Sequence, residues 1–167
     1  MSTAKPLLAE ESKIVLSNLA LLNSAAFTGD YVSLKNYESV EIIVGLAPAS
    51  GTDTAAITLK QASDVAATGE KALAFSPAFM HFNGAPGTSD ALVRTAVVSD
   101  SITTSALAAL ELYVIHVDAA SLDVANGFDC VRVHVTDPGS VSTPSFVLYI
   151  LRHCRYAQAT PPSAILD

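Results

Sequence analysis

The sequence has no tryptophan, few other aromatic residues and few charges. Aromatic residues make up 7% of the 167 residues and charged residues 15%, whereas hydrophobic residues make up 50%. A chain of this length and composition has enough apolar side chains for one core and too few charges for an intrinsically disordered protein. We therefore expect a single folded domain.

Basic residues and long apolar runs are also scarce. The chain has 9 lysine and arginine residues against 16 aspartate and glutamate residues, a formal net charge of -7 that repels nucleic-acid phosphates and anionic membranes. No run approaches the roughly 20 apolar residues that span a bilayer. The apolar run 14–22 follows Glu10 and Glu11 and lacks the basic region of a secretion signal. We expect neither nucleic acid nor a membrane as a partner.

Only two cysteines are present, Cys130 and Cys154. Neither has a second cysteine or a histidine at the short spacing of a structural zinc site. A disulfide between neighbouring strands remains geometrically open, but buried thiols are the expectation for a protein made in the cytosol.

The part of the chain that is rich in strand-forming residues begins at Tyr31. Runs of Val, Ile, Thr, Tyr and Phe alternate there with clusters of Gly, Pro, Asn, Asp and Ser, which predicts an all-β domain. The predicted strands are residues 31–34, 39–46, 55–61, 72–82, 92–99, 111–118, 128–136 and 145–156. Their uneven spacing favours an antiparallel two-sheet β-sandwich of jelly-roll type over an up-and-down barrel.

Two strands show the alternation most clearly. Val131, Val133 and Val135 share one face, and Val40, Ile42 and Val44 share another, so one side of each strand should point into a core. Residues 146–151 are apolar on both faces, although one sandwich buries only one face of each sheet. This pattern predicts a homo-oligomer. Residues 118–123 predict a helical turn, with Asp118 as its N-cap.

We divide the chain into an N-terminal arm (1–23), a β-sandwich domain (24–158) and a C-terminal arm (159–167). The N-terminal arm is compatible with a short amphipathic helix followed by an extended piece, or with a strand. In the C-terminal arm, two consecutive prolines favour polyproline II geometry, so truncation after Thr160 should leave the fold intact. The candidate partner-binding residues are Leu16, Leu19, Leu22, Arg152, Arg155, Tyr156, Pro161, Pro162, Ile165 and Leu166.

Three histidines on successive predicted strands offer the one candidate for catalysis. If His116, His134 and His153 converged, they would resemble the metal site of a cupin-like enzyme. Such a site needs two histidines separated by one residue, whereas these stand singly, and Arg132 would oppose a bound cation. The chain also lacks a Gly-x-Ser-x-Gly motif and a phosphate-binding glycine loop. We expect no metal, no cofactor and no enzymatic activity, with the cupin-like enzyme as an alternative.

Several stretches together resemble a known group of proteins. They are residues 28–37 (TGDYVSLKNY), 66–75 (AATGEKALAF), 126–133 (NGFDCVRV) and the closing Arg155-Tyr156 through Pro161-Pro162-Ser163-Ala164-Ile165. As a set they resemble small structural proteins of tailed bacteriophages that are encoded near the major capsid protein. Within that group, a jelly-roll protein of this size is similar to head decoration, or cement, proteins.

The resemblance implies a function without catalytic residues. It implies a virion protein, made in the cytoplasm of the host bacterium, that binds the major capsid protein and itself, commonly as a trimer. The alternative within phage particles is a head or tail fibre module that binds host glycan. Exposed aromatic side chains on loops would be expected for that module, and the sequence has few aromatic residues.

Overall fold

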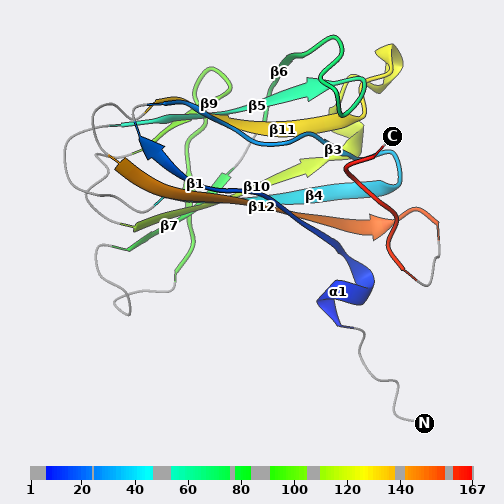
Figure 1. Ribbon diagram of the computed structural model, residues 1–167, viewed down its shortest axis with the longest axis horizontal. Coiled ribbons are helices and arrows are strands. Elements are labelled where there is room, and N and C mark those ends of the chain that lie inside the picture. Colours follow the sequence, from blue (N-terminus) through cyan, green and yellow to red (C-terminus); the bar gives the residue numbers. More distant parts are fainter. Residues whose placement is uncertain are drawn as a thin grey trace.

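The computed structural model folds the chain into two antiparallel β-sheets that pack against each other (Figure 1). It describes residues 7–23, 25–46, 54–75, 78–83, 91–104, 110–137, 142–156 and 160–166, with the backbone alone for residues 18–23, 78–83, 110 and 142–144. The predicted all-β class and two-sheet antiparallel β-sandwich are confirmed. The strand order does not establish the jelly-roll type, which stays a prediction.

The first sheet, sheet A, has six strands in the order β1-β12-β4-β10-β7-β8. Their bounds are β1 Lys13–Asn23, β12 Ser142–Cys154, β4 Tyr37–Leu46, β10 Leu110–Asp118, β7 Ala78–Asn83 and β8 Val93–Thr95. All neighbouring pairs are antiparallel, and β12 and β10 flank β4 along most of its length.

The second sheet, sheet B, is built around β11 (Cys130–Val135) and β5 (Ala56–Ala62), which pair antiparallel. On its other side β11 pairs first with β3 (Val32–Ser33) and then with β2 (Phe27–Thr28). The free side of β5 pairs with two short strands, β6 Lys71–Leu73 and β9 Ser101–Thr103. Sheet B therefore has a broken outer strand on each side of a continuous central pair.

The core lies between the two sheets and follows the predicted alternation. The valines at 131, 133 and 135 of β11 are buried, as are the valines and isoleucine at 40, 42 and 44 of β4. The largest fully buried side chains include Tyr37, Tyr113 and Tyr149. Tyr113 donates a hydrogen bond to the buried carboxylate of Glu111 at 2.6 Å, so these polar atoms meet inside the protein instead of meeting water.

Some predicted strand boundaries are wrong. The predicted strand 72–82 is two strands, β6 in sheet B and β7 in sheet A. Predicted strand 92–99 shortens to β8 and an isolated bridge between Val98 and Ser101. The sequence analysis missed β2 and β9, which are too short to show a periodic pattern.

The described N-terminal region belongs largely to the sandwich. After helix α1 (Leu8–Glu11), β1 pairs with β12 from Lys13 to Asn23 and forms the edge of sheet A. A bulge interrupts the pairing at Ser17, whose hydroxyl accepts a hydrogen bond from the N–H of Asp30 at 2.6 Å. The predicted arm 1–23 is corrected from residue 13 onward, because the long ladder satisfies backbone groups of β1. Residues 1–6 lie outside the described chain.

The C-terminal segment is docked on the sandwich between residues 160 and 166. Ala164 is fully buried in the core, and its carbonyl accepts a hydrogen bond from the N–H of Ser33 at 2.8 Å. The hydroxyl of Tyr37 donates to the carbonyl of Pro162. The predicted separate arm 159–167 is therefore corrected, because a small side chain and two carbonyls tie this segment to the domain. Residues 157–159 and 167 lie outside the description.

The helices are short. The predicted helical turn is a 3-10 helix, Ala119–Ser121, but Asp118 does not cap it with its side chain; instead the Ser121 hydroxyl donates to the Asp118 carbonyl at 2.6 Å. A second 3-10 helix, Val124–Asn126, ends at Gly127, whose φ of 81° suits a residue without Cβ. Within the described ranges no helix is long and apolar enough to cross a bilayer.

The two cysteines are thiols in different sheets. Cys130 is buried in β11 and its Sγ lies 3.1 Å from a carboxylate oxygen of Asp129, whereas Cys154 ends β12. The expected buried thiol is confirmed for Cys130, and the cross-strand disulfide is not formed, because the two residues belong to opposite layers of the sandwich.

Candidate interaction surfaces

The three histidines considered for a metal site lie on separate parts of the sandwich. His116 is on the outer face of sheet A, His134 is on the outer face of sheet B, and His153 is near the exposed end of β12. The convergence that a cupin-like site needs is therefore contradicted. Among the described side chains, no group of three or more His, Cys, Asp and Glu residues could hold a metal ion.

His116 instead lies between two carboxylates. Its Nδ1 is 2.9 Å from Glu41 and its Nε2 is 3.1 Å from Asp118, and Arg152 approaches Glu41 at 3.9 Å. Partial burial alone would lower the pKa of His116, but the hydrogen bonds to the two carboxylates outweigh it and raise the pKa above its usual value. We call these four residues the His116 cluster. It is polar, and it marks one end of the outer face of sheet A.

Beyond the His116 cluster, the described side chains on the outer face of β1, β12, β4 and β10 are apolar. Directly paired residues of neighbouring strands share a face, so the register arranges the outward side chains in rows. One row is Leu16, Leu148, Ile43 and Val114, the next holds Phe146, Gly45 and Leu112, and Ile14 and Ile150 lead into Glu41 and His116. We call the eight apolar side chains the sheet A face: Ile14, Leu16, Ile43, Leu112, Val114, Phe146, Leu148 and Ile150.

The sheet A face consists of aliphatic and aromatic side chains, the types that proteins usually bury. Ile14 and Leu16 are 42% and 60% exposed, and the other six side chains are partly exposed. An antiparallel sheet that meets water on one side usually carries polar residues there. A contiguous apolar patch bordered by charged groups is typical of a binding surface.

Gly45 shapes the sheet A face by letting an aromatic ring lie directly on β4. A Cβ atom at Gly45 would come within 2.0 Å of the ring of Phe146. The glycine therefore serves a close approach of side chain to backbone.

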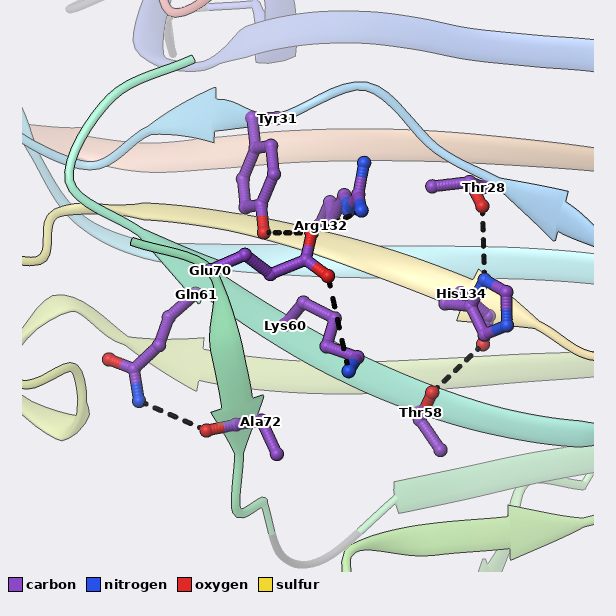
Figure 2. A network of polar contacts seen from close by, with 9 residues as sticks. All are labelled: Thr28, Tyr31, Thr58, Lys60, Gln61, Glu70, Ala72, Arg132 and His134. Atoms are coloured by element: carbon purple, nitrogen blue, oxygen red, sulfur yellow. Dashed lines mark hydrogen bonds and ion pairs between the residues drawn. The ribbon is translucent and has the colours of Figure 1, made fainter. Parts of the chain in front are cut away.

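The outer face of sheet B carries a polar network instead (Figure 2). Tyr31 donates a hydrogen bond to Glu70 at 2.9 Å, Arg132 donates to the same carboxylate oxygen, and Lys60 lies 4.0 Å from the other oxygen. The guanidinium of Arg132 stacks over the ring of Tyr31 at 4.7 Å. The network joins β11, β5 and the segment before β6 across the face of the sheet.

A hollow of about 450 Å³ lies beside this network and is bordered by Thr28, Lys60, Arg132 and His134, among others. Partial burial lowers the pKa of His134, and the positive charges of Lys60 and Arg132 lower it further. The glycan-binding alternative called for exposed aromatic rings. Tyr31 is 4% exposed and covered by Arg132, so this hollow offers charges and hydroxyls without an aromatic platform.

A second group of exposed apolar side chains lies where the C-terminal segment passes β1. Leu16 of β1 and Ile165 of the C-terminal segment line one hollow of about 560 Å³, together with the loop residues 65–67. Ile165 is 50% exposed and Leu166 is 71% exposed. Since Ala164 is anchored in the core, the two following side chains are held at a defined place. We call Ile165 and Leu166 the terminal patch.

The candidate residues at the end of β12 divide into structural and exposed positions. Arg155 closes this end of the sheet, because its N–H donates to the carbonyl of Asn36 at 2.9 Å and its Nε to that of Tyr37 at 3.1 Å. Arg152 belongs to the His116 cluster. Tyr156 is 63% exposed.

The remaining candidate residues are two prolines of the C-terminal segment and two leucines of β1. Pro161 and Pro162 are partly buried and lead into the anchored Ala164. In β1, the backbones of Leu19 and Leu22 pair with Phe146 and Thr143, and their side chains lie outside the described residues.

Two functional-looking residues were not singled out by the sequence analysis. Glu41 and Glu70 hold the two polar clusters together, and their partners His116 and Arg132 lie 75 and 62 residues further along the chain. The available signal for Glu41 was that it is the single charged residue of the predicted strand 39–46. Nothing local indicated Glu70, because its role depends on how the strands pair.

The sheets and surfaces define an all-β sandwich with two solvent-facing apolar surfaces. The chain matches no protein-family model, and no curated protein matches it. Among solved structures, it is similar to the crystal structure of SPBc2 prophage-derived protein YomS, with a TM-score of 0.45 and 15% identity over 86% of this chain and 94% of that chain. A likeness this distant says nothing of what this chain does.

Proposed function

We propose that this chain is a non-enzymatic structural protein of tailed-bacteriophage particles, and that it decorates the head by binding the lattice of the major capsid protein. Its place would be the virion, after synthesis in the cytoplasm of the host bacterium. The residue stretches that resemble small phage head proteins support this assignment. The terminal patch is the observation that carries it.

The terminal patch suits attachment because its apolar side chains are exposed but fixed. The hydrogen bond from Ser33 to Ala164 and the buried methyl group of Ala164 order the segment before any partner binds. Binding therefore loses less conformational entropy than it would for a free tail. Burying Ile165 and Leu166 would contribute roughly 1.5 to 3 kcal/mol each before ordering costs. Repeated attachment to a lattice then adds avidity.

The test is binding to purified heads of the phage that encodes the chain, measured by co-sedimentation and quantitative mass spectrometry. We expect the wild-type protein to sediment with heads at a copy number that matches the capsid lattice. A variant with Ile165→Asp and Leu166→Asp should remain in the supernatant. Val124→Asp is the matched control, because Val124 is 59% exposed and lies on the second 3-10 helix.

Two results would contradict the proposal. A few copies per particle would indicate a tail or portal position instead of lattice decoration. Equal sedimentation of the Ile165/Leu166 variant and the control would remove the terminal patch from the attachment surface.

A further inference from the structure

We propose that the sheet A face binds the same face of a second copy of this chain, about a two-fold axis that runs along β4. This inference concerns a different surface from the terminal patch. It goes beyond the proposed function and holds whether or not the protein belongs to a phage particle.

The apolar rows match themselves under this symmetry. β4 is the middle strand of β12-β4-β10, so an axis along β4 places β12 of one copy over β10 of the other. Leu148 then faces Val114, Phe146 faces Leu112, and Ile43 faces its own symmetry mate, as the register dictates. Sheets that pack face to face keep their strands within about 30° of each other, so the rows stay approximately in line.

The charges at the end of the face are also self-complementary. Arg152 of β12 and Asp118 of β10 are both register partners of Ser39 in β4, so they stand on either side of the proposed axis. The symmetry therefore brings Arg152 of each copy over Asp118 of the other. Glu41 of one copy would approach Glu41 of the other. Within each copy, however, the Glu41 carboxylate already contacts His116 and Arg152. An Arg152–Asp118 pair between the two copies thus forms on each side of the axis.

The area is small for a stable pair. Strands lie about 4.8 Å apart and advance about 3.3 Å per residue, so the face of β12, β4 and β10 between Phe146 and Arg152, which this axis superposes, covers roughly 300 Å². Pairing buries it twice, roughly 600 Å², and the relief of the side chains adds to this. Specific interfaces begin at about 1,000 to 1,200 Å². We therefore expect a dimer of weak affinity.

A two-fold contact uses the same patch on both copies, whereas a trimer needs two different patches that fit each other. The self-matching rows favour the dimer over the trimer that the resemblance implied. At Gly45 the ring of Phe146 lies close to the backbone, which suits contact between two sheets.

The first experiment is sedimentation equilibrium of the full chain from about 1 µM to about 1 mM. Ile43→Lys places two ammonium groups against each other on the axis, and it should raise the dimer Kd at least thirtyfold, about the change for a central interface residue. Val124→Lys is the matched control, exposed and outside the sheet A face, and should leave Kd unchanged. Thermal unfolding of each variant shows whether the variant is folded.

The second experiment does not depend on the tolerance of Ile43 for lysine. In a Cys154→Ser background, Ile43→Cys should be joined between copies by a bis-maleimide about 10 Å long, because facing sheets lie about 10 Å apart and the axis places the two thiols opposite each other. Val124→Cys is the control and should not. Arg152→Asp should weaken the dimer, Asp118→Arg should weaken it as well, and the two together should restore it.

A monomer over the whole concentration range, a trimer, or a dimer that Ile43→Lys leaves unchanged would each overturn the inference. So would charge reversals that fail to rescue each other while the crosslink does not form. Loss of head binding by the Ile165/Leu166 variant without loss of the dimer would separate the two surfaces.

Discussion

The hydroxyl of Tyr149 in sheet A accepts a hydrogen bond from the backbone N–H of Val133 in sheet B, at 3.1 Å. Both residues are fully buried. Val133 lies where the partner of β11 changes from β3 to β2, so the ladder leaves its N–H to another acceptor. Burial raises the pKa of Tyr149 well above its usual value, which keeps the hydroxyl neutral. The side chain of Tyr149 thus links the two sheets at the position where the outer strand of sheet B is interrupted.

We expect Tyr149→Phe to lower the free energy of unfolding by about 1 to 3 kcal/mol, because the buried N–H of Val133 loses its acceptor. Tyr156→Phe is the control, since Tyr156 is largely exposed. Urea denaturation of the three proteins measures the effect. A loss below about 0.5 kcal/mol for Tyr149→Phe would mean that the hydrogen bond contributes little.

A second prediction concerns Gly45 and Phe146. Gly45→Ala should destabilise the protein by about 1 to 3 kcal/mol, because the new methyl group would overlap the ring of Phe146. In a Phe146→Ala background the same change should stabilise the protein by about 0.5 to 1 kcal/mol, since alanine suits a strand better than glycine. A double-mutant cycle from denaturation midpoints checks the reversal of sign. Additive effects would contradict it.

A third prediction reverses the expectation for the C-terminal segment. Truncation after Thr160 should lower the free energy of unfolding by about 2 to 4 kcal/mol, because it removes the buried Ala164 and the acceptors of Ser33 and Tyr37. Changing Ile165 and Leu166 together to serine should cost less than about 0.5 kcal/mol, since both are exposed. Thermal and urea unfolding compare them. An unchanged melting temperature in the truncated chain would show that the segment does not hold the fold.

A fourth prediction follows from His116. Its pKa is raised in the folded protein by Glu41 and Asp118, against the effect of burial, so protonation favours the folded state. The stabilisation is complete below the ordinary histidine pKa of about 6.5 and is lost as the pH rises through the higher folded value. The stability difference between wild type and His116→Gln should therefore be larger at about pH 5.5 than at about pH 9.

Unfolding curves across this pH range measure the difference, and Glu41→Gln should reduce it by removing one of the two carboxylates. A difference that is constant with pH, or one that grows as the pH rises, would contradict the arrangement of charges around His116.

Several features of the fold could be predicted because they are local. The valines of 131–135 and of β4 point inward at every second residue, and a strand of period two needs no knowledge of its neighbours to show this. The same reasoning indicated that residues 146–151 are apolar on both faces. The helical turn at 119–121 was also visible from its own residues.

The candidate sites depended on pairing and were predicted less well. Leu16, Ile165 and Leu166 were chosen as exposed apolar residues near the chain ends, and the structure brings Leu16 and Ile165 to one hollow. Arg155 was chosen for its charge and instead bonds to the backbone of Tyr37. A side chain's partner across a sheet depends on register, and register is not visible in either strand alone.

By itself, the sequence determined the all-β class, the inward faces of the main strands and the surplus of apolar side chains, because composition and period-two alternation are properties of neighbouring residues. The tertiary structure alone decided that β1 pairs with β12, that Ala164 enters the core, and that His116 meets Glu41. These contacts join residues far apart in the chain. Their formation depends on which strands share a ladder and on which carbonyls and carboxylates are then left for a partner to reach.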